Sequence, residues 1–168
     1  MDVLSRVKAS QEALGINDKE VKSFAKGLGD FALVFGRGKA GMESIIYQLT
    51  QIADKGKPSY AQDIRPLFDA GGGAVLEKAF RKRYGMSLAQ ASEDRILDRQ
   101  KIFQALNDVI SEPKFQSKIE ERRMELPGQL DQLTTSLELL KESVGLVIED
   151  RKSTRLNSSH ANISYAVF

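Results

Sequence analysis

The sequence predicts an all-α fold: short amphipathic helices joined by Gly/Pro turns, ending in a heptad-patterned helix. Three features of the chain lead to this class. Apolar residues recur at spacings of three and four along most of the first 149 positions. Serine, asparagine or aspartate precedes several of these stretches, where it can cap a helix N-terminus. Glycine and proline fall between the stretches and end them.

Two helices are predicted in the N-terminal quarter. Residues 3–14 form a short amphipathic candidate, and Asn17 with Asp18 caps the second helix. Gly27 and Gly29 weaken this second helix by about 1 kcal/mol each relative to alanine. Its apolar residues share one helical face: Val21, Phe24, Ala25, Leu28, Phe31, Ala32 and Phe35.

A glycine-rich segment, GRGKAG at positions 36–41, follows the second helix. It formally matches the GxGxxG pattern of dinucleotide-binding proteins, and the preceding FALVF could be a strand. However, the helical period continues through FALVF, and no second strand is present to build a parallel sheet. We therefore favour a turn between two helices. A Walker phosphate loop is excluded because alanine follows Lys39.

The next predicted helix covers residues 42–55 and ends at Gly56. Ser59 with Gln62 then forms a capping box for a short helix, which Pro66 kinks or restarts. The inward positions of the first of these helices are Ile45, Ile46, Leu49 and Ile52.

Three consecutive glycines, 71–73, are predicted to be a hinge rather than a phosphate cradle, because no lysine and serine follow them. The helix 74–84 comes next and carries a basic cluster that could bind phosphate backbones. Glu77 lies four residues before Arg81, which favours an ordinary solvated face. No aromatic or groove-reading pattern accompanies the charge, so no nucleic acid is expected in this segment. The basic cluster is Lys78, Arg81, Lys82 and Arg83.

Three further helix starts follow. Ser87 with Gln90 forms a second capping box, and Asp98 can cap the helix after it. Pro113 begins a charged helix that runs to about Glu125. The apolar face of the helix after Asp98 is Ile102, Phe103, Leu106, Val109 and Ile110.

The last predicted helix, within residues 127–149, carries the clearest apolar stripe in the chain. Its spacings of three and four are those of a heptad pattern. Such a stripe packs either on neighbouring helices of its own chain or on other copies in a coiled coil, and the sequence leaves both open. It is the candidate seam for helix packing and self-association: Leu130, Leu133, Leu137, Leu140, Val144 and Val147.

The stretch from 41 to 90 resembles a known pattern. The phrase QLTQIADKGK, then DIRPLF, a glycine break, an amphipathic helix and YGMSLAQ resemble the small helical module in the conserved part of phage tail tape measure proteins. The likeness covers about residues 13–145. It implies a fragment of a structural phage or prophage tail protein, a virion component without catalysis in this segment. Family members run inside the tail tube, template its assembly and set tail length, since a helix rises 1.5 Å per residue.

The same resemblance implies partners and a location. The partners are other copies of the chain, tail tube proteins and tail assembly chaperone proteins, and the location is the host cytoplasm during assembly and then the interior of the virion tail tube. Residues 1–126 would form the tape-measure module, and residues 127–149 would start a longer coiled-coil-like helix. Two alternatives remain: a free-standing cytoplasmic helical adaptor that binds partner helices, and a nucleic-acid binder that uses the basic face.

The final segment, 150–168, reads DRKSTRLNSSHANISYAVF and resembles a translated sequencing-library adapter. We expect it to be an artefact, non-native or disordered, with genuine protein ending at about Glu149 as a piece of something longer. The alternative is a Ser/Asn-rich tail with a final edge strand. If the segment is an artefact, His160 and the acceptor-like motif 157–159 carry no function. The segment holds three basic residues and one acidic residue, so the rest of the chain is electrically neutral.

Composition excludes several function classes. The chain has no cysteine, so disulfides, thiolate catalysis and cysteine-ligated zinc are impossible within it. The balance of 25 basic to 23 acidic residues gives no bulk field toward nucleic acid or membrane. The longest apolar run, 31–35, is too short to span a bilayer. Without a histidine before position 160, and without HExxH or paired-acid spacing, we expect no enzyme and assign no catalytic residue, cofactor or metal.

Overall fold

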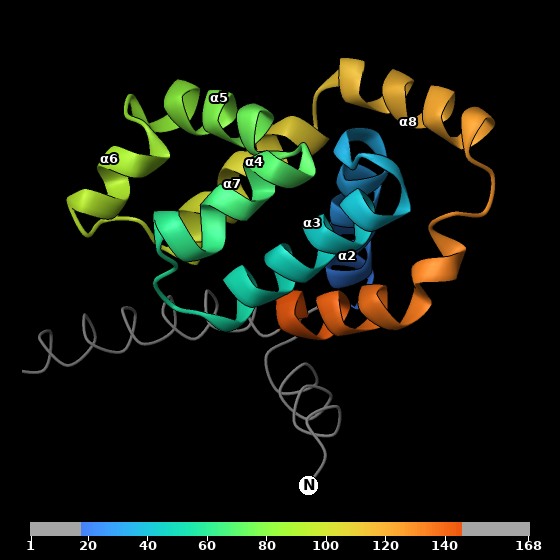
Figure 1. The fold of residues 1–168 in the computed structure, drawn as a ribbon, viewed down its shortest axis with the longest axis horizontal. Helices are drawn as coiled ribbons and strands as arrows, with labels where there is room; N and C mark the ends of the chain where they lie inside the picture. The colour runs from blue at the N-terminus through green and yellow to red at the C-terminus, as the bar shows by residue number, and fades with distance from the viewer. Residues whose placement is uncertain (1–17, 146–168) are drawn as a thin grey trace, which may run out of the picture.

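The structure is a computed structural model that describes residues 18–145, with side chains described from residue 22. Within this range the chain forms helices and turns and no strand, which confirms the all-α class (Figure 1). The predicted helix at 3–14, Val147 and the adapter-like segment 150–168 lie outside the described residues.

The elements follow one another through short turns. The described helices are α2 (Asp18–Phe35), α3 (Gly38–Asp54), the π-helical turn η1 (Tyr60–Ile64), α4 (Arg65–Ala70), α5 (Gly73–Tyr84), α6 (Leu88–Glu93), α7 (Arg99–Ile110), α8 (Pro113–Glu125) and the 3₁₀ turn η2 (Asp131–Leu133). Residues 134–145 are again helical. We call residues 126–128 the hinge and residues 129–145 the strap.

Helix α2 is the centre of the fold. Residues 27–34 are all buried, so its second half is covered on every side. Helices α3, α7 and α8 pack against it, and after α8 the chain turns back so that the strap, orange to red in Figure 1, reaches α2 as well. A helix that is buried all round is a core helix rather than a surface one. Apolar side chains from α2 to the strap belong to one core.

Helices α5 and α7 pack together beside this centre. The Arg83 guanidinium donates from Nη1 to both carboxylate oxygens of Asp108 at 2.9 Å. The Tyr84 hydroxyl donates to Gln104 Oε1 at 2.5 Å. The hydrogen bonds to Asp108 are the main reason that the pKa of Arg83 is raised above its ordinary value.

The turn between α2 and α3 is shorter than predicted, because α3 begins at Gly38 rather than at Met42. Gly36 permits this close junction. A Cβ at Gly36 would lie 2.5 Å from the Ala32 carbonyl oxygen and 2.7 Å from the Met42 amide nitrogen. The glycines of this segment therefore serve backbone packing between two helices.

The three glycines 71–73 form a packed corner, which corrects the hinge interpretation. Gly71 ends α4 with φ at 114°, where a Cβ would lie 2.2 Å from the Phe35 carbonyl oxygen. A Cβ at Gly72 would lie 2.8 Å from Phe31 Cε1. The helix break is present as predicted, but its glycines let the α4–α5 corner sit directly on α2.

The cap at Ser59 differs from the prediction by one residue. The Gln62 amide donates to Ser59 Oγ at 3.3 Å, as expected. The reciprocal acceptor is Asp63 rather than Gln62, since the Ser59 amide donates to Asp63 Oδ2 at 2.7 Å. Asp63 is buried and also pairs with Lys55. The cap is therefore tied to the end of α3.

The two later caps form where the sequence places them. The Gln90 amide donates to Ser87 Oγ at 3.0 Å, and the Lys101 amide donates to Asp98 Oδ1 at 2.8 Å. A carboxylate of the preceding helix adds to the first cap, because the Leu88 amide donates to Glu77 Oε2 at 3.1 Å. Local capping chemistry thus sets the starts of α6 and α7.

Candidate functional site

The described part of the predicted seam, from Leu130 to Val144, lies on the strap and faces the chain's own core. Leu133, Leu140 and Val144 are buried, and Leu130 and Leu137 are partly buried and packed against the same core. Leu139, between these positions, is 53% exposed. The described part of the stripe therefore packs on neighbours within the chain, which is one of the two arrangements that the sequence leaves open. Association with other copies remains a prediction.

Two glycines of α2 allow neighbouring elements to approach its backbone. A Cβ at Gly29 would lie 3.0 Å from Leu137 Cδ2 of the strap. A Cβ at Gly27 would lie 2.8 Å from Ile110 Cγ2 at the end of α7. These two glycines lower the helix propensity of α2, but they let both neighbours pack close to its backbone.

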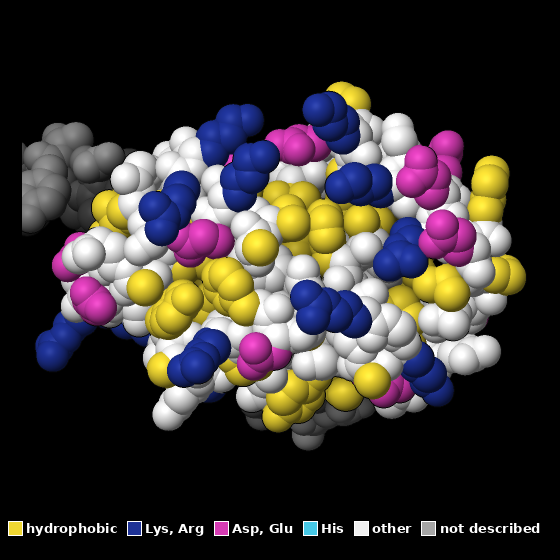
Figure 2. Space-filling view, turned by 45° about the horizontal axis from the view of Figure 1, so that its top comes forward, with side chains coloured by type: hydrophobic (Ala, Val, Ile, Leu, Met, Phe, Trp, Pro, Cys, Tyr) yellow, Lys and Arg dark blue, Asp and Glu magenta, His cyan; other side chains and the backbone are white. Residues whose placement is uncertain are grey.

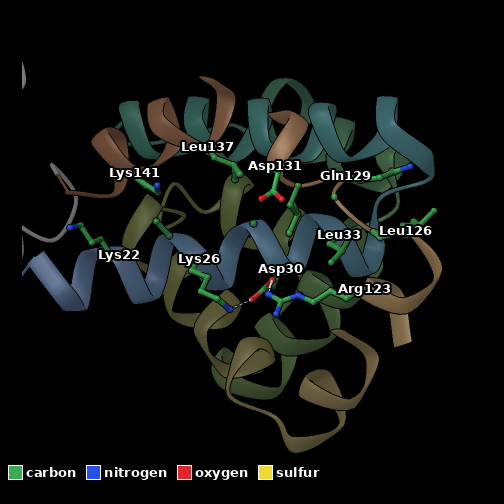
Figure 3. Close-up of a pocket in the computed structure, with 15 residues that line it drawn as sticks. Lys22, Lys26, Asp30, Leu33, Arg123, Leu126, Gln129, Asp131, Leu137 and Lys141 are labelled. Carbon is green, nitrogen blue, oxygen red and sulfur yellow. Dashed lines mark hydrogen bonds and ion pairs between the residues drawn. The ribbon is translucent and has the colours of Figure 1, made fainter. Parts of the chain in front are cut away.

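A cavity of about 700 Å³ lies between α2, the end of α8, the hinge and the strap (Figure 3). Its floor is mainly apolar, and several charged side chains stand around it. This volume is within the range of small-molecule pockets. The apolar lining residues are Ala25, Leu33, Leu126, Pro127, Leu130 and Leu137.

Asp30 is the buried charge of this region, with 4% of its side chain exposed. It accepts from Lys26 Nζ at 2.8 Å and from Arg123 Nη2 at 2.8 Å, as the dashed lines in Figure 3 show. A buried carboxylate without partners would be costly, so both cations are needed to hold it. The pair with Arg123 fixes the last turn of α8 on the middle of α2.

Gln129, the first residue of the strap, also lines the cavity. Its Oε1 atom is buried and has no hydrogen-bond partner. The cavity that it lines has room for water molecules, which can donate to this oxygen.

Sequence reasoning did not single out Asp30, Arg123, Gln129 or the cavity. One signal was available, since Asp30 interrupts the apolar run of residues 28–34. An acidic residue on a buried face needs a cationic partner. Its identity could not be read from the sequence, because Arg123 is 93 residues away.

The basic cluster of α5 is partly neutralised. Arg81 Nε donates to Glu77 Oε1 at 2.5 Å within α5, and Arg83 pairs with Asp108 of α7. Figure 2 shows Asp, Glu and apolar side chains between the Lys and Arg side chains on the face in view. These pairs support the solvated-face interpretation of the cluster.

The GxGxxG segment is a junction between helices. FALVF is the last turn of α2 rather than a strand, and residues 38–41 belong to α3. The dinucleotide alternative required a strand before the glycines, so the structure contradicts it.

Residues 18–145 contain neither of two other features. Within that range, no three or more acidic, histidine or cysteine residues come together as a possible metal site. Nor does any helix there have the length and apolar character needed to cross a membrane.

Comparison with known proteins adds no assignment: no family model, no curated protein and no solved structure matches the chain.

Proposed function

We propose that this chain is part of a phage or prophage tail tape measure protein, in which residues 18–145 form a compact helical packing module. One observation carries the proposal. The short phrases that resemble the tape measure module coincide with the ends of helices in the structure. The phrases that carry the resemblance in sequence therefore correspond to helix boundaries in the structure.

The coincidence can be followed along the chain. QLTQIADKGK ends α3, which stops at Asp54 before the Lys-Gly turn. DIRPLF contains the switch from η1 to α4 at Arg65. The glycine break follows, and YGMSLAQ contains the end of α5, the left-handed Gly85 and the cap of α6. Each phrase supplies a stop or a start rather than a chemical group.

The compact shape favours a packing role for this module within the proposed tape measure protein. If residues 18–145 formed one straight helix, they would extend about 190 Å at 1.5 Å per residue. Folded around α2, they contribute far less to length. In this proposal, extended helical stretches of the protein measure the tail, and the module holds copies or assembly partners together.

The test is genetic and structural. The gene is altered in the phage or prophage that encodes it, with an in-frame deletion of the module or an insertion of helical heptads after the strap, and tail lengths are measured by electron microscopy. Mass spectrometry of purified virions looks for peptides of residues 18–145. We expect the peptides in virions and a tail length that follows the inserted length.

Two results would contradict this function. One is virions of normal tail length that lack these peptides. The other is an insertion that leaves tail length unchanged while the protein is present. Recovery of the chain only in the cytoplasm, bound to helical partners, would favour the adaptor hypothesis instead.

A further inference from the structure

The strap is joined to the rest of the fold by a single hinge. Gly128 takes φ at 77°, and a Cβ there would meet nothing within 4 Å. Leu126 leaves helical geometry at φ −132° and ψ 62°. A change of backbone angles at these residues would move the strap relative to α8, and the space around a Cβ at Gly128 is open.

Opening the strap breaks neither ion pair described at the cavity. The two partners of Asp30 lie on α2 and α8, outside the strap. Lys141, on the strap, pairs with Glu138 of the same helix at 2.6 Å. No buried charge of these pairs is stranded when the strap leaves, so the electrostatic cost of opening is small.

The cavity beneath the strap further lowers the free energy needed to open it. Contacts are missing where the cavity lies, so less dispersion energy is lost on opening than for a filled interface. The strap is therefore an element of low local stability compared with α2 and its other neighbours.

What remains to be covered after opening is mainly apolar, although Ser143 of the strap is also buried. The strap presents Leu133, Leu140 and Val144, and α2 presents Ala25 and Leu33 beside Gly29. A second copy of the chain carries the same strap and the same groove. Its strap would reproduce every contact of the closed form, including Leu137 over Gly29, so exchange needs no new complementary surface.

We propose that copies of this chain exchange straps, the strap of one copy occupying the α2 groove of another. The inference deepens the proposed function and rests on it for the setting in which copies meet. It also gives the apolar stripe a defined partner. The stripe joins copies through the contacts it makes within one chain, rather than through a separate coiled coil.

The chain has no cysteine, so single cysteines report the exchange directly. Two full-length variants, Gly29→Cys and Leu137→Cys, are mixed in denaturant, refolded together and oxidised. Replacing Leu137 removes the methyl that a Cβ at position 29 would touch at 3.0 Å. The matched control pairs Gly29→Cys with Leu139→Cys instead of Leu137→Cys. Leu139 lies on the same helix but is 53% exposed. Peptide mass mapping counts the disulfides between chains.

We expect the 29–137 disulfide between chains at least tenfold above the 29–139 disulfide of the control. Equal amounts of the two would overturn the proposal. A second variant removes residues 127–129, which shortens the hinge and prevents closure within one chain. Light scattering should then show folded dimers or larger assemblies. A folded monomer, or a chain whose strap does not dock, would also overturn it.

The two proposals fail separately. If copies exchange straps in solution but tail length does not change, the tail function is contradicted and the exchange is supported. If tail length follows the inserted length but the 29–137 disulfide shows no excess, the tail function is supported and the exchange is contradicted.

Discussion

Arg123 Nη2 lies 2.8 Å from Asp30 Oδ1 and joins the last turn of α8 to the middle of α2. The arginine side chain is half exposed, whereas the aspartate side chain is almost fully buried. The partners are therefore not equivalent. Water can solvate the cation if the pair is lost, but it cannot reach the carboxylate as readily.

This asymmetry predicts the stability of two variants relative to the parent chain in urea unfolding. Lys26→Ala combined with Arg123→Ala leaves a buried carboxylate unpaired, and we expect a loss of about 3 kcal/mol or more. Asp30→Asn in the same double-variant background should recover part of that loss, because it removes the charge and keeps the shape. If the double variant were as stable as the parent chain, Asp30 would not be buried as described.

Alanine substitutions at Gly71 and Gly85 form a matched test of the packed corner at residues 71–73. Both take positive φ, 114° and 72°. A Cβ at Gly71 would lie 2.2 Å from the Phe35 carbonyl oxygen, whereas nothing lies within 4 Å of a Cβ at Gly85. Gly85→Ala should cost about 1 kcal/mol for left-handed backbone alone. Gly71→Ala should cost several-fold more in chemical denaturation, and equal losses would contradict the packed corner.

Gly27 and Gly29 predict opposite signs for the same substitution. Alanine improves helix propensity by about 1 kcal/mol at either position. At Gly29 the obstacle is the end of the Leu137 side chain, which borders the cavity and can move into it, so Gly29→Ala should stabilise the fold. At Gly27 the obstacle is the branched Ile110 side chain at 2.8 Å. Gly27→Ala should destabilise, and thermal unfolding of the two variants measures the difference.

Leu140 and Leu139 test whether the strap contributes to stability. Leu140 is fully buried and Leu139 is 53% exposed on the same helix. Leu140→Ala should cost about 2–5 kcal/mol, the range for a core leucine. Leu139→Ala should change stability by less than about 0.5 kcal/mol. Similar losses for both variants in urea unfolding would show that the strap does not dock with this face inward.

The sequence predicts the local features of this fold well. Ser59, Ser87 and Asp98 begin helices as expected, because a cap depends on residues three or four positions away. The apolar positions of α2 are also predicted from local spacing, because residues three and four positions apart lie on the same side of a helix. One detail of the predicted caps is wrong. Asp63 rather than Gln62 accepts from the Ser59 amide, because the π-helical turn brings Asp63 to that position.

Features that depend on distant residues could not be predicted. Three successive glycines are compatible with a loose hinge or with a tight corner, and only the position of Phe31 and Phe35 decides between them. The partners of Asp30 and the cavity under the strap depend on how α8 and the strap return to α2. Periodicity identifies which side of the strap is apolar, but it does not name what covers that side.

The hollow between the strap and α2 also makes the fold sensitive to hydrostatic pressure. Unfilled space makes the volume of a protein larger than that of its opened form with water inside, and pressure favours the smaller volume. Compression should therefore detach the strap while α2, α3 and α7 remain assembled. Opening of the strap under pressure would then precede any loss of packing around α2.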